Sequence, residues 1–191
     1  RKIVEALQEE VWVGALFTRG KPGELLGSVA GTLSFESIHW DHARSGDILV
    51  DENWNDDKND KGYKGMGYSK GVAGHGGISP YEVHIALIAS GPSFKKRFVS
   101  ELPTSNVDIA PTVLALHGLK IPGEMDGRVL SELFVGAASP ALKTKQVETT
   151  VTAPTSKGTY KLVLYRSILG ESAYVDKARS EERRVGKECT I

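Results

Sequence analysis

The sequence contains a single cysteine, Cys189, and no excess of charge of either sign. One cysteine cannot form an internal disulfide framework or supply the paired thiolates of a structural zinc site. Lys plus Arg and Asp plus Glu number 24 each, whereas a general binder of nucleic acid or anionic membranes needs a basic excess. The longest apolar runs, such as residues 85–89, are far too short for a membrane span. We therefore expect neither nucleic-acid polymer binding nor a membrane span.

Several catalytic signatures are also missing. The sequence has no G-x-x-x-x-G-K-[ST] phosphate loop, no G-x-S-x-G serine elbow and no H-E-x-x-H metal motif. The lack of a serine elbow argues against an α/β-hydrolase-type esterase, although the His75-Gly76-Gly77 triplet is similar to an oxyanion loop. With 40% apolar and 25% charged residues, the 191-residue chain can nevertheless bury a core.

The apolar pattern predicts strands and helices in mixed order. Strands are predicted at residues 11–17, 48–50, 83–90, 146–152, 159–168 and 173–175. A three-turn helix is predicted between Asp108, a good N-cap, and Gly118, with Pro111 in the first turn. Shorter helices are predicted near residues 1–10 and 129–134. This order indicates an α/β fold, in which residues 11–17 and 83–89 would form the parallel part of the sheet.

Five histidines are candidates for catalysis or metal binding: His39, His42, His75, His84 and His117. His84 is predicted to pack within a strand, and His117 falls where a helix C-terminus favours imidazolium. His75 differs, because it lies in Gly74-His75-Gly76-Gly77 at the end of a long polar, glycine-rich loop over residues 51–77. Flanking glycines permit positive φ and close approach of a ligand, so His75 is a metal or catalytic candidate. A purely structural glycine-rich turn is the alternative.

A second candidate group lies in residues 40–47. Asp41, His42 and Asp47 could be metal ligands, and Arg44 could bind a phosphate or a carboxylate. The favoured interpretation is simpler: an ion-paired loop that leads into the strand at Ile48.

Residues 179–191 form a charged run without apolar periodicity. They resemble the translation of a common sequencing-adapter oligonucleotide read through into the gene. An ordinary solvated tail is the alternative. We expect this segment to be a non-native tail, and Cys189 would then not be native either.

Four segments occur in a familiar order. They are GHGGISPYE at 74–82, IASGPSFK at 88–95, NVDIAPTVL at 106–114 and MDGRVL at 125–130. This order resembles the C-terminal part of the alkaline phosphatase superfamily, closest to its type I phosphodiesterase/nucleotide pyrophosphatase branch. The resemblance runs over residues 11–176, with its specific part at 44–134.

The resemblance implies a metal-dependent hydrolase of small phosphoesters. In that family two divalent metal ions, usually zinc, lie about 4 Å apart and clamp the phosphoryl group. A Thr or Ser nucleophile forms a covalent phospho-enzyme, and His75 matches a metal-ligating histidine. The family's nucleophile and its other metal ligands come earlier in its chain, where an Asp-His-Gly motif is expected. Asp41-His42 is followed by Ala43 rather than by glycine, so the second metal site is not assigned to it. We therefore expect residues 1–178 to be the C-terminal portion of one alkaline phosphatase-like catalytic domain. Its mixed sheet, flanked by helices, would be incomplete, and this portion alone would be inactive.

Two further alternatives stay open. A sulfatase-type hydrolase shares these motifs but uses a modified Cys or Ser and calcium. A non-catalytic domain could keep the fold without the chemistry. The family is often periplasmic or secreted, which favours those locations, and the isolated portion is expected to expose apolar edges.

Overall fold

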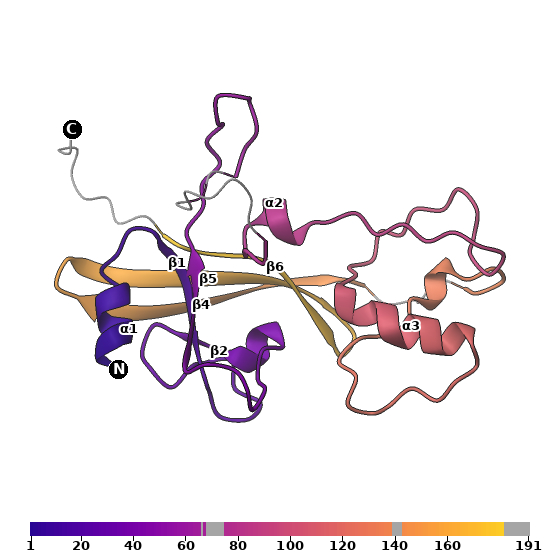
Figure 1. Cartoon of the computed structure of the whole chain (residues 1–191), viewed down its shortest axis with the longest axis horizontal. Helices are drawn as coiled ribbons and strands as arrows, with labels where there is room; N and C mark the ends of the chain where they lie inside the picture. The colour runs from indigo at the N-terminus through magenta and orange to yellow at the C-terminus, as the bar shows by residue number, and fades with distance from the viewer. Residues whose placement is uncertain (66, 68–74, 139–142, 182–191) are drawn as a thin grey trace. The chain divides into compact units, whose positions relative to one another are not determined.

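The computed structural model describes residues 1–65, 67, 75–138 and 143–181 (Figure 1). It is a mixed α/β structure with two three-stranded sheets and few helices, which confirms the α/β class. The chain divides into two compact units. The first unit comprises Arg1–Ile85, Glu148–Tyr165 and Val175–Ile191, and the second unit comprises Ala86–Val147 and Arg166–Tyr174. The more specific alkaline phosphatase-like architecture stays a prediction.

The first sheet has the order β2-β1-β3. Strand β1 (Val13–Thr18) is buried at every residue, as expected for an uninterrupted apolar run in the middle of a sheet. It pairs in parallel with the short β2 (Leu33–Ser34) and antiparallel with β3 (Ile48–Glu52). The 3₁₀ helix η1 (Phe35–Ile38) follows β2 directly. The predicted strands at 11–17 and 48–50 are therefore confirmed, with shifted ends.

The second sheet has the order β4-β5-β6. Its strands are β4 (Lys145–Thr155), β5 (Gly158–Leu169) and β6 (Ser172–Ser180), so all three strands predicted in this region are present and longer than expected. Strand β6 continues past residue 178, where the non-native tail was predicted to begin. The Ser180 hydroxyl donates to the carbonyl of Val13 at 2.8 Å. The fold thus uses the first residues of this segment, whose foreign origin stays a prediction, while Cys189 lies outside the described residues.

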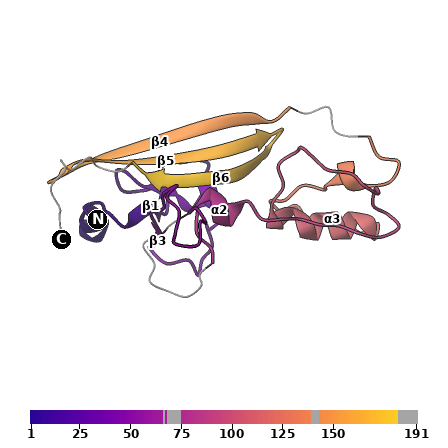
Figure 2. The same ribbon diagram turned by 90° about the horizontal axis from the view of Figure 1, so that it is seen from above.

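The core of the first unit lies between these sheets (Figure 2). Helix α1 (Lys2–Leu7) contributes Val4, which is 1% exposed, whereas Ile3 faces solvent. The indole N–H of Trp54 donates to the carbonyl of Ala178 at 2.7 Å, which fixes the chain after β3 against β6. The largest buried side chains at this core come from β1, β2, η1 and β5: Leu16, Phe17, Leu33, Phe35, Leu162 and Leu164.

The strand predicted at residues 83–90 is wrong. Ser79 and Pro80 start a short helix, α2 (Pro80–Val83), and residues 84–90 that follow it belong to no strand. Their side chains are exposed, including Ile88 at 88%. A strand requires a hydrogen-bonding neighbour, and no described strand pairs with this segment. The predicted parallel pairing of residues 11–17 with 83–89 is therefore also wrong, since β1 pairs with β2 and β3.

The second unit contains the predicted helix as α3 (Ile109–Leu116), preceded by η2 (Asn106–Asp108). Asp108 occupies the N-cap position as expected, although its side chain makes no capping hydrogen bond to α3, and Gly118, with φ +63, lies just beyond the end of the helix. The buried residues of α3 are Pro111 and Thr112, whereas Ile109 and Val113 of the expected apolar face stay about half exposed. The helix predicted at 129–134 is the single turn η3 (Ser131–Leu133).

No helix in the described part of the chain combines the length and hydrophobicity needed to cross a bilayer.

Candidate functional site

His75 is exposed and lies in the irregular segment that leads to α2. Gly76 beside it has φ +83, a conformation that glycine adopts without strain, which confirms the expected backbone freedom at this position. Gly74 lies outside the described residues, as does most of the end of the 51–77 loop. The structure thus presents His75 to solvent next to a glycine with a positive φ.

Carboxylates lie beside the segment that contains His75. The carboxylate of Glu82, on α2, accepts a hydrogen bond from the Ser79 hydroxyl at 3.1 Å and occupies the space next to Gly77. Asp51, on β3, accepts a hydrogen bond from the backbone N–H of Ile78. The segment before α2 is therefore held at two points: Ile78 is bonded to Asp51 of β3, and Ser79 is bonded to Glu82 of α2.

Burial is the main reason why the pKa of Asp51 rises from 3.8 to about 6. The hydrogen bond from Ile78 opposes the rise, and the negative charges of Glu82 and Glu52 add to it. The folded state consequently keeps the Asp51 proton to higher pH than the unfolded chain does. The stability linked to this proton is present below pH 3.8 and lost as the pH rises through about 6.

We expect Asp51→Asn to remove this pH dependence. The free energy of unfolding of the wild type, relative to the variant, should fall between about pH 4 and about pH 7, measured by urea denaturation. Asp47→Asn is the matched control, because Asp47 is exposed and immediately precedes β3. Parallel pH profiles for the wild type and Asp51→Asn would contradict the assignment.

No group of three or more His, Cys, Asp or Glu side chains in the described residues is placed so that it could hold a metal ion. A catalytic zinc normally has three protein ligands. These residues therefore do not by themselves form the zinc site that the resemblance implies. His75 stays a predicted ligand that would need partners outside the described residues.

The loop at residues 40–47 is ion-paired, which confirms the favoured interpretation. The Arg19 guanidinium contacts the Asp41 carboxylate and also donates to the carbonyl of His42 at 3.2 Å. The imidazole Nδ1 of His42 accepts the backbone N–H of Arg44 at 3.1 Å, which holds the turn before β3. These side chains are engaged in fixing the loop.

Three other histidines stand at helix ends. His84 was predicted to pack within a strand, and this is wrong: it is exposed and follows the last residue of α2. His117 follows the last residue of α3 and is exposed, in line with the expected position at a helix C-terminus. His39 ends η1 with φ 55. Within the described residues, none of these three forms a group of three or more possible metal ligands with His75.

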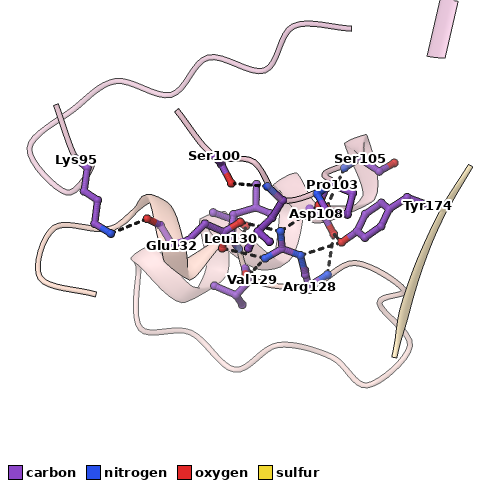
Figure 3. A network of polar contacts seen from close by, with 12 residues as sticks. Lys95, Ser100, Pro103, Ser105, Asp108, Arg128, Val129, Leu130, Glu132 and Tyr174 are labelled. Carbon is purple, nitrogen blue, oxygen red and sulfur yellow. Dashed lines mark hydrogen bonds and ion pairs between the residues drawn. The ribbon is translucent and has the colours of Figure 1, made fainter. Parts of the chain in front are cut away.

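A network of polar contacts in the second unit is centred on Asp108 (Figure 3). Asp108 is fully buried, and one carboxylate oxygen accepts the backbone N–H of Ser105 at 2.9 Å. The other accepts the backbone N–H of Arg128 at 2.8 Å and the Tyr174 hydroxyl at 3.4 Å. Asp108 therefore connects the turn before α3 to the segment at 125–130.

Arg128 and Glu132 form a two-pronged ion pair in the same network. The guanidinium nitrogens lie 2.9 and 2.7 Å from the two carboxylate oxygens of Glu132, whose side chain is 1% exposed. Arg128 also donates to the Tyr174 hydroxyl at 2.9 Å and to the Pro103 carbonyl at 3.1 Å. Burial is the largest influence on the pKa of Glu132 and would raise it, but the hydrogen bond and positive charge of Arg128, together with hydrogen bonds from the Glu132 backbone and from Ser100, outweigh it and the pKa is lowered. Glu132 is therefore held as a carboxylate.

The network joins two of the segments that carry the resemblance, 106–114 and 125–130. The Thr112 hydroxyl accepts the backbone N–H of Leu130 at 3.0 Å, in addition to the contacts of Asp108. Sequence reasoning identified Asp108 as a helix N-cap and as part of the motif at 106–114, and it missed Glu132 and Tyr174. The sequence did contain one signal of this network. Glu132 lies between the apolar residues Leu130 and Leu133, so it is expected to be buried, and a buried charge needs a partner of opposite charge.

Comparison with protein-family models, curated proteins and solved structures finds no match for this chain.

Proposed function

We propose that this chain is the C-terminal portion of a metal-dependent phosphoester hydrolase, of the phosphodiesterase/nucleotide pyrophosphatase or phosphatase kind. His75 contributes one ligand to one of two divalent metal ions, with zinc as the expected metal. The nucleophilic Thr or Ser and the remaining ligands belong to a part of the enzyme that precedes these residues. The substrate is a small molecule with a phosphoester bond.

The observation that carries this proposal is the ordered set of motifs at 74–82, 88–95, 106–114 and 125–130. Two of them are joined by Asp108, Thr112 and Arg128, which gives their residues a shared structural reason to occur together. The exposure of His75 beside Gly76 supports the proposal further, because a ligand histidine must be reachable by the metal. A neutral imidazole nitrogen is a common zinc ligand.

The proposal predicts that His75 is required in the enzyme that includes the preceding part of the gene. His75→Ala should lower the zinc content and reduce kcat/KM for a bis-aryl phosphodiester by about 100-fold or more, since even indirect support of a ligand is worth 10–100-fold. His117→Ala is the matched control, because His117 is also an exposed histidine. Zinc content follows from atomic emission, and turnover from absorbance.

The 191-residue chain alone provides the second arm of the test. It should show no phosphodiester turnover with added zinc, because one histidine does not form a catalytic site. Turnover by this chain that His75→Ala abolishes would contradict the proposal. A longer enzyme with His75 intact that binds no zinc would instead favour a non-catalytic domain, and bound calcium with a modified Cys or Ser nucleophile would favour a sulfatase-type hydrolase.

A further inference from the structure

The side chain of Arg166 is enclosed on a strand face that also carries buried apolar residues. Successive residues of a strand point to opposite faces, so Arg166 of β5 shares its face with Leu162 and Leu164, which are 0% exposed. Arg166 is itself only 8% exposed. Because a guanidinium stays protonated in proteins, the strand holds a buried positive charge at this position.

No residue in the described part of the chain neutralises this charge. The Nε atom of Arg166 is shielded from solvent and has no hydrogen-bond partner there. Burial lowers the pKa of Arg166, and no described carboxylate opposes that effect. Arg128 shows the contrast: burial lowers its pKa as well, but the hydrogen bond to Glu132 and the nearby Tyr174 outweigh burial, so the pKa is raised. Arg128 is thus paired with a carboxylate, whereas Arg166 is paired with none of the described ones.

The strands on either side of β5 each contain one acidic residue. Glu148 of β4 is exposed, and its charge acts on the ammonium group of Lys161. Asp176 of β6 takes part in a polar interaction, but no ion pair joins it to Arg166. The described strands of this sheet therefore do not supply the anion.

A carboxylate matches this guanidinium in shape and in charge. Nε and one terminal nitrogen lie on the same edge of the planar group, and such an edge donates in parallel to the two oxygens of one carboxylate. One negative charge neutralises one positive charge, whereas a phosphate dianion would leave a buried negative charge unpaired. The exposed 8% of Arg166 belongs to atoms other than Nε, which leaves the side chain reachable from solvent.

We propose that Arg166 binds a carboxylate. The carboxylate belongs either to a small organic acid or to an acidic side chain of a polypeptide portion that precedes these residues. Both sources present the same pair of oxygens to the guanidinium. The site needs neither a metal ion nor His75, so the first source is independent of the proposed hydrolase function, whereas the second source rests on it.

Urea denaturation of the 191-residue chain at pH 7, with acetate as the probe, tests the site. At an ionic strength kept constant with chloride, the urea midpoint of the wild type should rise with acetate. Above the Kd, each tenfold increase in acetate should raise the folded-to-unfolded ratio about tenfold, because only the folded chain binds acetate. Arg166→Met should show no rise, and Arg166→Lys a smaller one, since an ammonium keeps the charge without the two-pronged edge. Arg44→Met is the matched control: Arg44 is an exposed arginine, and its variant should respond like the wild type.

The stability of the variants without acetate gives an independent readout. Replacing an unpaired buried charge by an apolar side chain should leave the urea midpoint unchanged or raise it. A lower midpoint for Arg166→Met would show that the guanidinium already has a partner within the chain, and an equal loss in Asp176→Asn would identify Asp176 as that partner. Either this result, or an acetate response that is absent from the wild type or equal in Arg166→Met, would overturn the proposal.

The same measurement on a longer enzyme that includes the preceding portion separates the two sources. If a small organic acid is the ligand, the longer wild type should respond to acetate and its Arg166→Met variant should not. If a side chain of the preceding portion is the ligand, the longer enzyme should show no acetate response, and Arg166→Met should lower its urea midpoint because a buried carboxylate loses its cation. No acetate response together with an unchanged midpoint in Arg166→Met would contradict both sources.

Discussion

Replacing Arg128 by Met should lower the free energy of unfolding by about 3–5 kcal/mol, the usual cost of removing one partner from a buried ion pair. Arg128→Met leaves the carboxylate of Glu132, at 1% exposure, without its cation. It also removes a donor to the Tyr174 hydroxyl and to the Pro103 carbonyl. Urea denaturation followed by circular dichroism measures the loss.

Two controls separate the buried pair from charge removal in general. Lys161→Met removes the cation of the exposed Lys161–Glu181 pair, and little or no loss is expected because solvent screens this pair. In Arg128→Met combined with Glu132→Leu, a large part of the stability should return, since no buried charge is left unpaired. A loss of the same size from Lys161→Met and Arg128→Met would show that the network is not the cause.

Gly127→Ala should destabilise the protein by about 3 kcal/mol, at the upper end of the cost of overpacking. A Cβ atom on Gly127 would lie 2.0 Å from the carbonyl oxygen of Val107 and 2.8 Å from the backbone nitrogen of Asp108. These are backbone atoms at the turn before α3, so no side-chain rotation relieves the contact. The segments at 106–114 and 125–130 would have to separate, and the bond between Arg128 and Asp108 would lengthen or break.

Gly123→Ala is the matched control for this substitution. Gly123 lies four positions earlier in the same connection, and a Cβ atom there has no neighbour within 4 Å. Equal stability losses for the two alanine variants, measured by the same urea denaturation, would contradict the close packing of Gly127.

Local sequence signals predicted a helix or strand correctly where the element also packs or pairs with another part of the fold. Strand β1 is largely apolar and β5 carries an apolar run at its centre, and both contribute buried residues to the core of the first unit, so their burial agrees with their pattern. Helix α3 begins and ends where Asp108 and Gly118 indicate. The segment at 84–90 has an equally good strand pattern but forms no strand. Whether a neighbouring strand is available for pairing depends on the rest of the fold and cannot be read from the segment itself.

The candidate site was predictable only in part, for a similar reason. The positive φ beside His75 could be predicted, because the glycine that adopts it is visible in the sequence. The network of Asp108, Arg128 and Tyr174 joins residues that are 20 and 66 positions from Asp108, and no local pattern encodes such contacts. The raised pKa of Asp51 depends on burial by distant segments and is equally invisible in the sequence.

The buried position of Trp54, whose indole is bonded to Ala178, makes tryptophan fluorescence a probe of the first unit. All three tryptophans, Trp12, Trp40 and Trp54, belong to the first unit, and the second unit has none. Trp54 is 6% exposed, so its emission should shift to longer wavelength when the first unit opens, while opening of the second unit alone leaves it unchanged. Strands β5 and β6 contribute residues to both units. If tryptophan emission and circular dichroism report the same unfolding transition, the two units unfold cooperatively; two different transitions would show that they unfold separately.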